Sequence, residues 1–95
     1  MHYVLARITV KPEVSDLAKC ILVDLATKSR QEPGCMSYEL YQQAEALHVF
    51  QTVEQWKEKA DADAHMATLH VGAAIAAAGP LFAAAPEILA YSRLL

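Results

Sequence analysis

Alternation of apolar and polar residues at the start of the chain predicts a β-strand. Every second side chain from Val4 to Val10 is apolar and falls on the same face. A period of two is the periodicity of an extended strand. Three later segments follow the same rule, so the pattern predicts four strands. The strands are expected at residues 2–11, 35–42, 47–54 and 87–94.

Apolar residues between the first two strands recur instead at helical spacing. Val14, Leu17, Ile21 and Leu25 form one apolar stripe, which predicts an amphipathic helix. Glu32-Pro33-Gly34 ends it, because proline cannot continue the helical hydrogen bonds and glycine accepts the positive φ of a reversal. Two shorter helices are expected later, at residues 57–66 and 68–78, with Thr68 as the N-cap of the second.

The predicted order is strand, helix, strand, strand, helix, strand, with the second helix in two pieces. This order is typical of an α+β protein with the ferredoxin-like split βαβ arrangement, an antiparallel sheet with helices on one face. We expect residues 1–95 to form one domain. The other sheet face would carry Leu5, Phe50 and Tyr91 with no helix over them. An apolar face of this size predicts a homodimer that packs sheet on sheet.

Composition narrows the function classes. Of the 95 residues, 55% are apolar and 20% charged, which predicts a compact fold. The net charge is −3 and the basic residues are scattered from Arg7 to Arg93, which argues against a nucleic-acid partner. The N-terminal residues lack a secretory signal, so a cytoplasmic location is expected. The uncharged stretch from residue 64 to 86 is broken by Gly79-Pro80, so no membrane span is expected.

The sequence also predicts no metal site. His65 and His70 are five residues apart, which puts them about 140° apart around one continuous helix. They can share an ion only if the helix breaks between them, as Thr68 would allow, and no third ligand stands at a suitable spacing.

Three segments, in this order and on a chain of this length, resemble the antibiotic biosynthesis monooxygenase family. They are Glu32-Pro33-Gly34-Cys35-Met36-Ser37-Tyr38-Glu39-Leu40, Phe50-Gln51-Thr52-Val53-Glu54-Gln55-Trp56, and Ala64-His65-Met66 with His70 after it. The resemblance implies a dimeric α+β barrel and a small-molecule cleft between sheet and helices. It further implies oxidation of a quinol-like or phenolic substrate by dioxygen with no metal or flavin cofactor. An electron-rich phenol can reduce dioxygen itself once a base removes its proton.

The family pattern places Glu, Trp and His where this chain has Glu54, Trp56 and His65. Trp56 would form an aromatic wall, Glu54 would orient a donor or a substrate hydroxyl, and His65 would act as a base. Each also has a purely structural reading: a core ring for Trp56, a hydrogen-bonded buried imidazole for His65 and a strand-edge charge for Glu54. Strand faces alone add four candidates for the substrate-binding lining. These are Arg7, Tyr38, Phe50 and Tyr91.

Other branches of the family set limits on the activity. The haem-degrading branch uses an Asn, Trp and His trio, and this chain contains no Asn, so haem degradation is not expected. A phosphorylated substrate would need cationic donors, and only Arg7 and Arg93 stand in suitable positions. Two alternatives to the monooxygenase remain open at this point: a small-molecule-binding stress-response module without turnover, and an isomerase of small carbonyl compounds.

Overall fold

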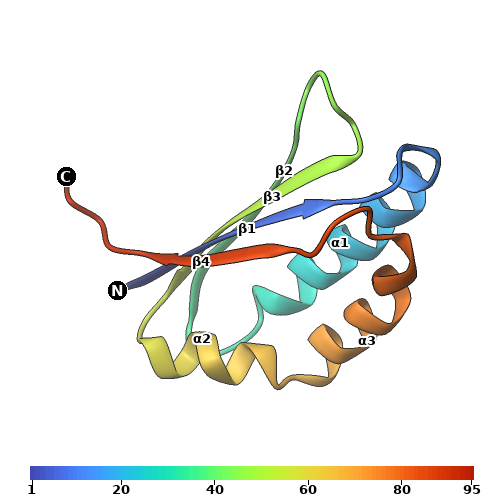
Figure 1. Cartoon of the computed structure of the whole chain (residues 1–95). Helices are drawn as coiled ribbons and strands as arrows, with labels where there is room; N and C mark the ends of the chain where they lie inside the picture. Colours follow the sequence, from blue (N-terminus) through green and yellow to red (C-terminus); the bar gives the residue numbers. More distant parts are fainter.

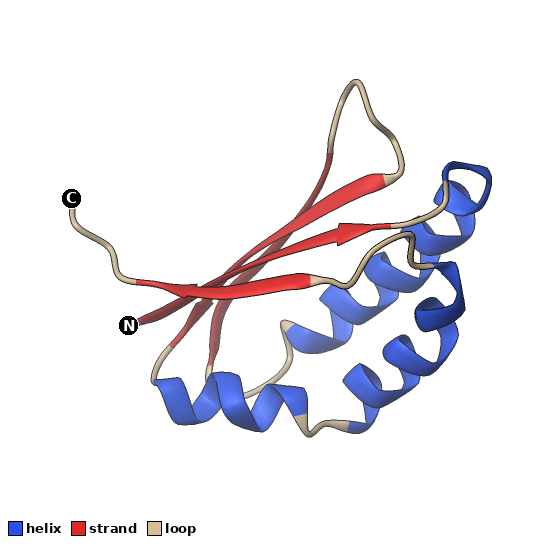
Figure 2. Ribbon diagram, in the orientation of Figure 1, coloured by secondary structure: helices blue, strands red, loops and turns tan.

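The computed structural model describes all 95 residues and forms an antiparallel sheet with helices on one face (Figures 1 and 2). The sheet order is β2-β3-β1-β4, which confirms the predicted α+β ferredoxin-like fold. The strands are β1 (His2–Thr9), β2 (Cys35–Gln42), β3 (Val49–Trp56) and β4 (Glu87–Tyr91). The helices are α1 (Ser15–Ser29), α2 (Lys59–Met66) and α3 (Leu69–Ala78), with short 3₁₀ turns at Pro12–Val14 and Gly79–Leu81.

Three of the four strands differ in their bounds from the sequence prediction. β1 ends at Thr9, two residues earlier than expected. β3 begins and ends two residues later than expected, since the amide of Val49 closes the hairpin turn onto the carbonyl of Ala46. Trp56 therefore lies in the strand, where it pairs with His2 of β1. β4 stops at Tyr91 because its partner there is Tyr3, close to the start of β1. The shift matters for the site, because it places Thr52, Glu54 and Trp56 on one face of one strand.

The sheet register decides which side chains meet the helices. Ile8 lies opposite Phe50, so Phe50 shares the helix-covered face of β1 and is buried in the core. The prediction that Phe50 belongs to the open sheet face is therefore wrong. One core cluster surrounds Trp56 and Tyr38, and a second surrounds Phe50 and Leu22.

The open sheet face carries a continuous apolar row. Leu5 in β1 lies opposite both Val53 in β3 and Leu89 in β4. Tyr3 lies opposite Tyr91 in the same way. Val53, Leu89 and Tyr91 are exposed, and all three helices lie on the other side of the sheet (Figure 1).

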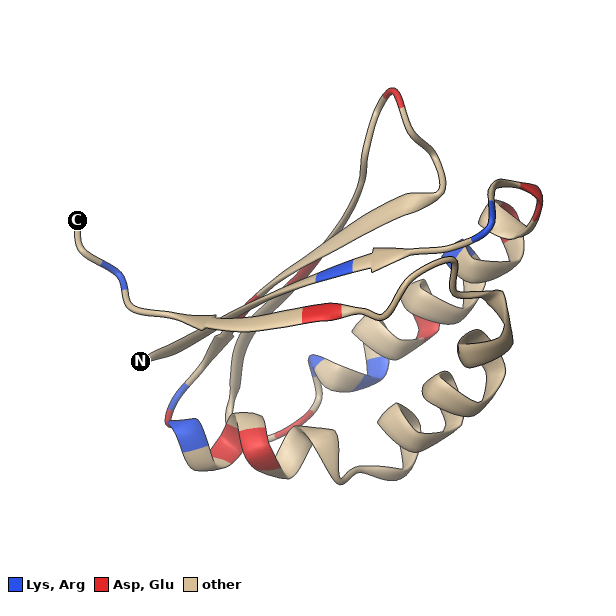
Figure 3. Cartoon of the chain, in the orientation of Figure 1, with Lys and Arg blue, Asp and Glu red and all other residues tan.

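Charged residues are spread over the strands, α1 and α2, whereas α3 carries none (Figure 3). No helix combines the length and the apolar character needed to cross a membrane. The uncharged α3 packs against α1, and its small side chains Ala74 and Ala78 are buried.

The turn before β2 is fixed by a steric constraint at Gly34. No residue has a positive φ, so the expectation that Gly34 provides one is wrong. A Cβ at Gly34 would lie 2.2–2.4 Å from side-chain atoms of Asp61. Asp61 accepts a hydrogen bond from the Glu58 amide in the capping box of α2. Glycine is required here because the turn and the start of α2 touch.

Replacing Gly34 by Ala should lower the melting temperature, because the new methyl group displaces the Asp61 cap. Loss of a helix cap costs about 0.5–2 kcal/mol. The control is Gly72→Ala in α3, where a Cβ would meet no atom within 4 Å, and which should stabilise the helix by about 0.5–1 kcal/mol. Thermal melts of both variants measure the difference; equal melting temperatures would show that the contact at Gly34 is not a constraint.

Candidate functional site

A cavity of about 400 Å³ lies between the helix-covered sheet face and the helices. Fifteen of its 20 lining residues are hydrophobic. β1 contributes Val4, Ala6 and Ile8, β4 contributes Ile88 and Ala90, and α3 contributes Val71, Ala74, Ile75 and Ala78. The polar lining residues are Tyr38, Thr52, Glu54, Asp63 and His65. An apolar cavity with few polar groups is the usual form of a small-molecule site.

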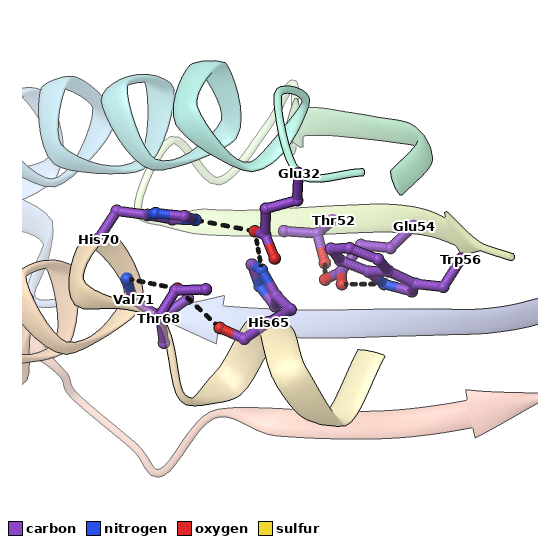
Figure 4. A network of polar contacts seen from close by, with 8 residues as sticks. All are labelled: Glu32, Thr52, Glu54, Trp56, His65, Thr68, His70 and Val71. Atoms are coloured by element: carbon purple, nitrogen blue, oxygen red, sulfur yellow. Dashed lines mark hydrogen bonds and ion pairs between the residues drawn. The ribbon is translucent and has the colours of Figure 1, made fainter. Parts of the chain in front are cut away.

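A buried carboxylate, that of Glu54, faces this cavity. Its two oxygens accept one hydrogen bond each, at 2.7 Å from the Thr52 hydroxyl and at 3.0 Å from the Trp56 indole N–H (Figure 4). Positions 52, 54 and 56 meet because alternate residues of β3 share a face. Glu54 has no ion-pair partner. Neutral donors alone hold the carboxylate, and its remaining lone pairs are free for a ligand hydroxyl.

Two imidazoles converge on one oxygen of a second carboxylate, Glu32. His65 Nδ1 lies 2.6 Å and His70 Nε2 lies 2.8 Å from Glu32 Oε2 (Figure 4). The helical path is interrupted between α2 and α3. There the Thr68 hydroxyl donates to the His65 carbonyl and accepts a hydrogen bond from the Val71 amide, as the N-cap of α3. This break turns His70 toward His65. Glu32 therefore fixes the orientation of the His65 ring in the way that a carboxylate orients a catalytic imidazole.

The remaining ring nitrogen of His65, Nε2, is open to the cavity. It makes no hydrogen bond within the protein, and the only fully buried side-chain polar atom without a partner is Ser29 Oγ. His65 is 4% exposed and lines the cavity. Its ring centroid lies 4.7 Å from that of Trp56 and 5.7 Å from that of Tyr38. A donor atom in the cavity can therefore reach an imidazole nitrogen that is held in place.

Tyr38 supplies the opposite kind of hydrogen-bonding group. Burial raises the pKa of its hydroxyl well above the usual range, and the nearby Glu54, Cys35 and Glu32 raise that pKa further. The hydroxyl stays protonated at neutral pH and makes no hydrogen bond within the protein. Tyr38 therefore presents a donor to the cavity, directly opposite Glu54 in the sheet register.

The raised pKa of Tyr38 predicts a loss of stability in alkali. Above about pH 10 the tyrosine of the unfolded chain loses its proton while folded Tyr38 keeps its own. The free energy of unfolding should then fall by up to about 1.4 kcal/mol per pH unit more in the wild type than in Tyr38→Phe. Urea denaturation between pH 9 and 11 measures this slope. The exposed Tyr41→Phe variant should keep the wild-type slope; a wild-type slope in Tyr38→Phe would contradict the assignment.

The sequence profile of the antibiotic biosynthesis monooxygenase family matches residues 1–77, which include every polar residue described above. The chain belongs to the antibiotic biosynthesis monooxygenase family. No curated protein matches the chain.

Solved structures extend the similarity over the whole chain. One named as an antibiotic biosynthesis monooxygenase is 26% identical, with each chain covered in full and a TM-score of 0.95. A Pseudomonas aeruginosa protein is 29% identical over 99% of this chain and 94% of its own, with a TM-score of 0.92. A Caulobacter crescentus protein, provisionally named as an antibiotic biosynthesis monooxygenase, is 29% identical over 99% of this chain and 90% of its own, with a TM-score of 0.90.

In this member of the antibiotic biosynthesis monooxygenase family, the structure groups only some of the residues predicted from the sequence. Glu54, His65 and Tyr38 line the cavity. Trp56 is fully buried behind Glu54 and His65, so it supports these two side chains and is not an exposed aromatic wall. Phe50 is buried in the core outside the cavity lining.

Arg7 and Tyr91 do not belong to the cavity lining. Arg7 lies opposite Gln51 and Tyr91 lies opposite Tyr3, so both side chains point to the open sheet face. Residues at odd positions of β1 face away from the helices because successive side chains of a strand alternate. Their predicted place in the lining is therefore corrected.

Sequence reasoning missed Glu32 and His70 as site residues. Glu32 precedes the Pro33-Gly34 turn and reads there as a solvated loop charge, but its side chain is only 13% exposed. The helix breaks at Thr68, as two histidines that share an ion require, and Glu32 supplies the third ligand-type residue that the sequence pattern did not indicate. Ligand atoms of Glu32, His65 and His70 lie within 4.8 Å of one another.

Proposed function

We propose that this family member is a monooxygenase that oxidises a small phenolic or hydroquinone substrate with dioxygen and needs no cofactor for that reaction. One observation carries the proposal. An apolar cavity has a hydrogen-bond donor (Tyr38), a carboxylate (Glu54) and an oriented imidazole (His65) together in its wall. A base, an anion-stabilising donor and a dry pocket are what such a reaction requires of the protein.

The polar groups gather at one end of the cavity. Val4 and Tyr38 both lie opposite Glu54 in the sheet, and Tyr38 and His65 pack together. The other end is formed around Ile8 and Phe82. Val4 and Ile8 are four positions apart along β1, a distance of about 13 Å. The cavity therefore suits a ring with hydroxyl groups at one end and apolar substituents at the other.

The proposed reaction begins with a proton transfer. The substrate hydroxyl gives its proton to His65 Nε2, and Glu32 on the far side of the ring stabilises the imidazolium. The phenolate that forms accepts a hydrogen bond from Tyr38. The Glu54 carboxylate would repel the phenolate oxygen. Glu54 therefore accepts a hydrogen bond from a second substrate hydroxyl, which keeps its proton. Trp56 and Thr52 keep Glu54 in this orientation.

The substrate supplies all the electrons in this scheme. The phenolate reduces dioxygen, a ring carbon forms a bond to oxygen, and the resulting hydroperoxide loses water as its O–O bond breaks. A hydroquinone and dioxygen thus give a hydroxyquinone and water. One oxygen atom enters the product and the other leaves as water, a four-electron oxidation.

Charge in the cavity disfavours a phosphorylated substrate. The lining contains Glu54 and Asp63 but no Lys or Arg, and Arg7 lies on the other sheet face. Phosphate recognition relies on cationic donors. A neutral substrate that donates hydrogen bonds fits the lining better.

The test is oxygen uptake with a panel of hydroquinones, run alongside anaerobic incubations. The proposal predicts uptake above the uncatalysed rate for at least one hydroquinone and one product per oxygen consumed. Product formation without oxygen would replace it with an isomerase. A ligand that raises the melting temperature but is recovered unchanged, with no uptake for any compound, would replace it with a binding module.

We also propose that the protein is a homodimer joined through the open sheet face. The support is the apolar row of Val53, Leu5 and Leu89 on that face. Sedimentation should give twice the 10.4 kDa chain mass at micromolar concentration. Val53→Arg should shift the protein to monomer, while Leu17→Arg on the exposed side of α1 should not. A wild-type monomer, or equal effects of both variants, would contradict the dimer.

A further inference from the structure

We propose that Glu32, His65 and His70 form a binding site for a divalent transition-metal ion of the zinc class. The three residues come from different segments: the turn after α1, the end of α2 and the start of α3 (Figure 4). Two imidazole nitrogens and one carboxylate oxygen are ligands that Zn²⁺ takes, and three protein ligands leave a fourth position for water. Nothing in the proposed oxidation requires an ion here.

The ligand atoms are close to the required spacing. Nδ1 of His65 and Nε2 of His70 lie 2.6 and 2.8 Å from Glu32 Oε2, which are hydrogen-bond distances. Bonds of about 2.0–2.1 Å to a tetrahedral zinc ion put neighbouring ligand atoms about 3.3 Å apart. The carboxylate oxygen must therefore retreat by about 0.7 Å from His65 Nδ1 and about 0.5 Å from His70 Nε2. A carboxylate at the end of a flexible side chain can make that movement without any change in the helices.

Charge also favours a cation at this point. Glu32 has no Lys or Arg partner, and both of its ion-pair contacts are to histidine. The nearest basic residue in sequence, Arg30, is engaged with the Tyr38 carbonyl and Glu39. A divalent ion would thus meet a carboxylate that no fixed positive charge neutralises.

The ion would lie behind His65, outside the cavity. His65 lines the cavity, whereas Glu32 and His70 do not. The His70 side chain is 20% exposed and the His65 side chain 5% exposed, so solvent reaches the cluster from the His70 side. Metal and substrate would therefore reach the two nitrogens of the His65 ring from opposite sides.

This arrangement has a consequence for the proposed reaction, and this consequence alone depends on that proposal. An ion on Nδ1 requires the ring proton to be on Nε2, which turns the cavity-facing atom from an acceptor into a donor. Zinc would then block proton removal from the substrate. The ion would be a reversible inhibitor and not the centre that activates oxygen.

Metal binding is tested without any substrate. Calorimetric titration of the chelator-treated full chain with Zn²⁺ should give one ion per chain, and Co²⁺ should give a visible absorption band typical of four-coordinate sites. His70→Ala should weaken Zn²⁺ binding at least about tenfold and abolish the band. His48→Ala, which removes a histidine outside the cluster, should bind as the wild type does. Circular dichroism checks that both variants fold.

The site would be overturned if the wild type bound no Zn²⁺ below about 100 µM, or if wild type and His70→Ala bound Zn²⁺ equally. Loss of Zn²⁺ binding in His48→Ala would also overturn it. Oxygen uptake by the chelator-treated protein separates this result from the proposed function. Uptake without Zn²⁺ binding supports the oxidation and overturns the site. Zn²⁺ binding without uptake supports the site and overturns the oxidation.

Discussion

Replacing His65 by Ala should lower the rate of substrate-dependent oxygen uptake by about 10²–10⁴-fold, the usual contribution of a positioned acid or base. The side chain is the only imidazole in the cavity lining, and its Nε2 atom has no partner in the protein. Without it, the substrate hydroxyl must lose its proton to water, and the phenolate loses the imidazolium beside it. The oxygen electrode measures the rate at saturating substrate.

Two comparisons separate this chemical role from a structural one. His48→Ala, a histidine outside the cavity lining, should keep the wild-type rate. Added imidazole should partly restore uptake in His65→Ala, because the truncated side chain leaves room for it beside Glu32. Wild-type uptake in His65→Ala would remove the base from the mechanism. A loss that imidazole does not restore, with a lowered melting temperature, would leave His65 a structural residue.

Replacing Trp56 by Ala should lower the free energy of unfolding by about 3–5 kcal/mol. The indole is completely buried, packs edge-on against Tyr38 with ring centroids 6.5 Å apart, and lies beside His65. Its removal opens a cavity in the core around Tyr38 and deprives Glu54 of one of its two donors. Such a loss is a large part of the 5–15 kcal/mol that typically holds a domain folded. Urea denaturation measures it.

The Trp56→Phe variant isolates the hydrogen bond from the packing. Phenylalanine keeps an aromatic ring but cannot donate to Glu54 Oε1, which should cost about 1–3 kcal/mol. If Trp56 acts mainly by holding Glu54, the rate of oxygen uptake in Trp56→Phe should fall even under conditions in which the variant is fully folded. A Trp56→Ala protein within about 1 kcal/mol of wild type would show that the indole is not central to this core.

Periodicity predicted the strands and α1 because each carries a clear repeat, whereas the Thr68 cap and the Gly79-Pro80 break marked out α2 and α3. The alternation of Val4 to Val10 and the helical stripe from Val14 to Leu25 specify their elements locally. The relative phase of neighbouring strands is not local. The sequence prediction therefore put Phe50 on the wrong face, since only the pairing of Ile8 with Phe50 fixes which β3 residues meet the helices.

The candidate site was predicted only in part, because some of its residues meet only when distant segments pack together. Glu54 and His65 stand in a segment pattern that resembles the family, and both line the cavity. Glu32 also stands in that pattern, at the start of its first segment. The pattern assigns it no role, because a glutamate before Pro-Gly looks like any loop residue until the chain folds α2 and α3 over it. Arg7 and Tyr91 were assigned from strand faces alone, without the register that fixes the relative phase of the strands, and that register places both on the open face.

The fate of isotopically labelled oxygen shows directly whether the protein is a monooxygenase. The protein would be incubated with the hydroquinone that gives the fastest uptake, under dioxygen labelled with oxygen-18, and the product analysed by mass spectrometry. One labelled atom should appear in each product molecule and one in water, and the labelled product should be greatly reduced in His65→Ala. Unlabelled product, or hydrogen peroxide in place of water as the reduced form of oxygen, would contradict the proposed monooxygenase reaction.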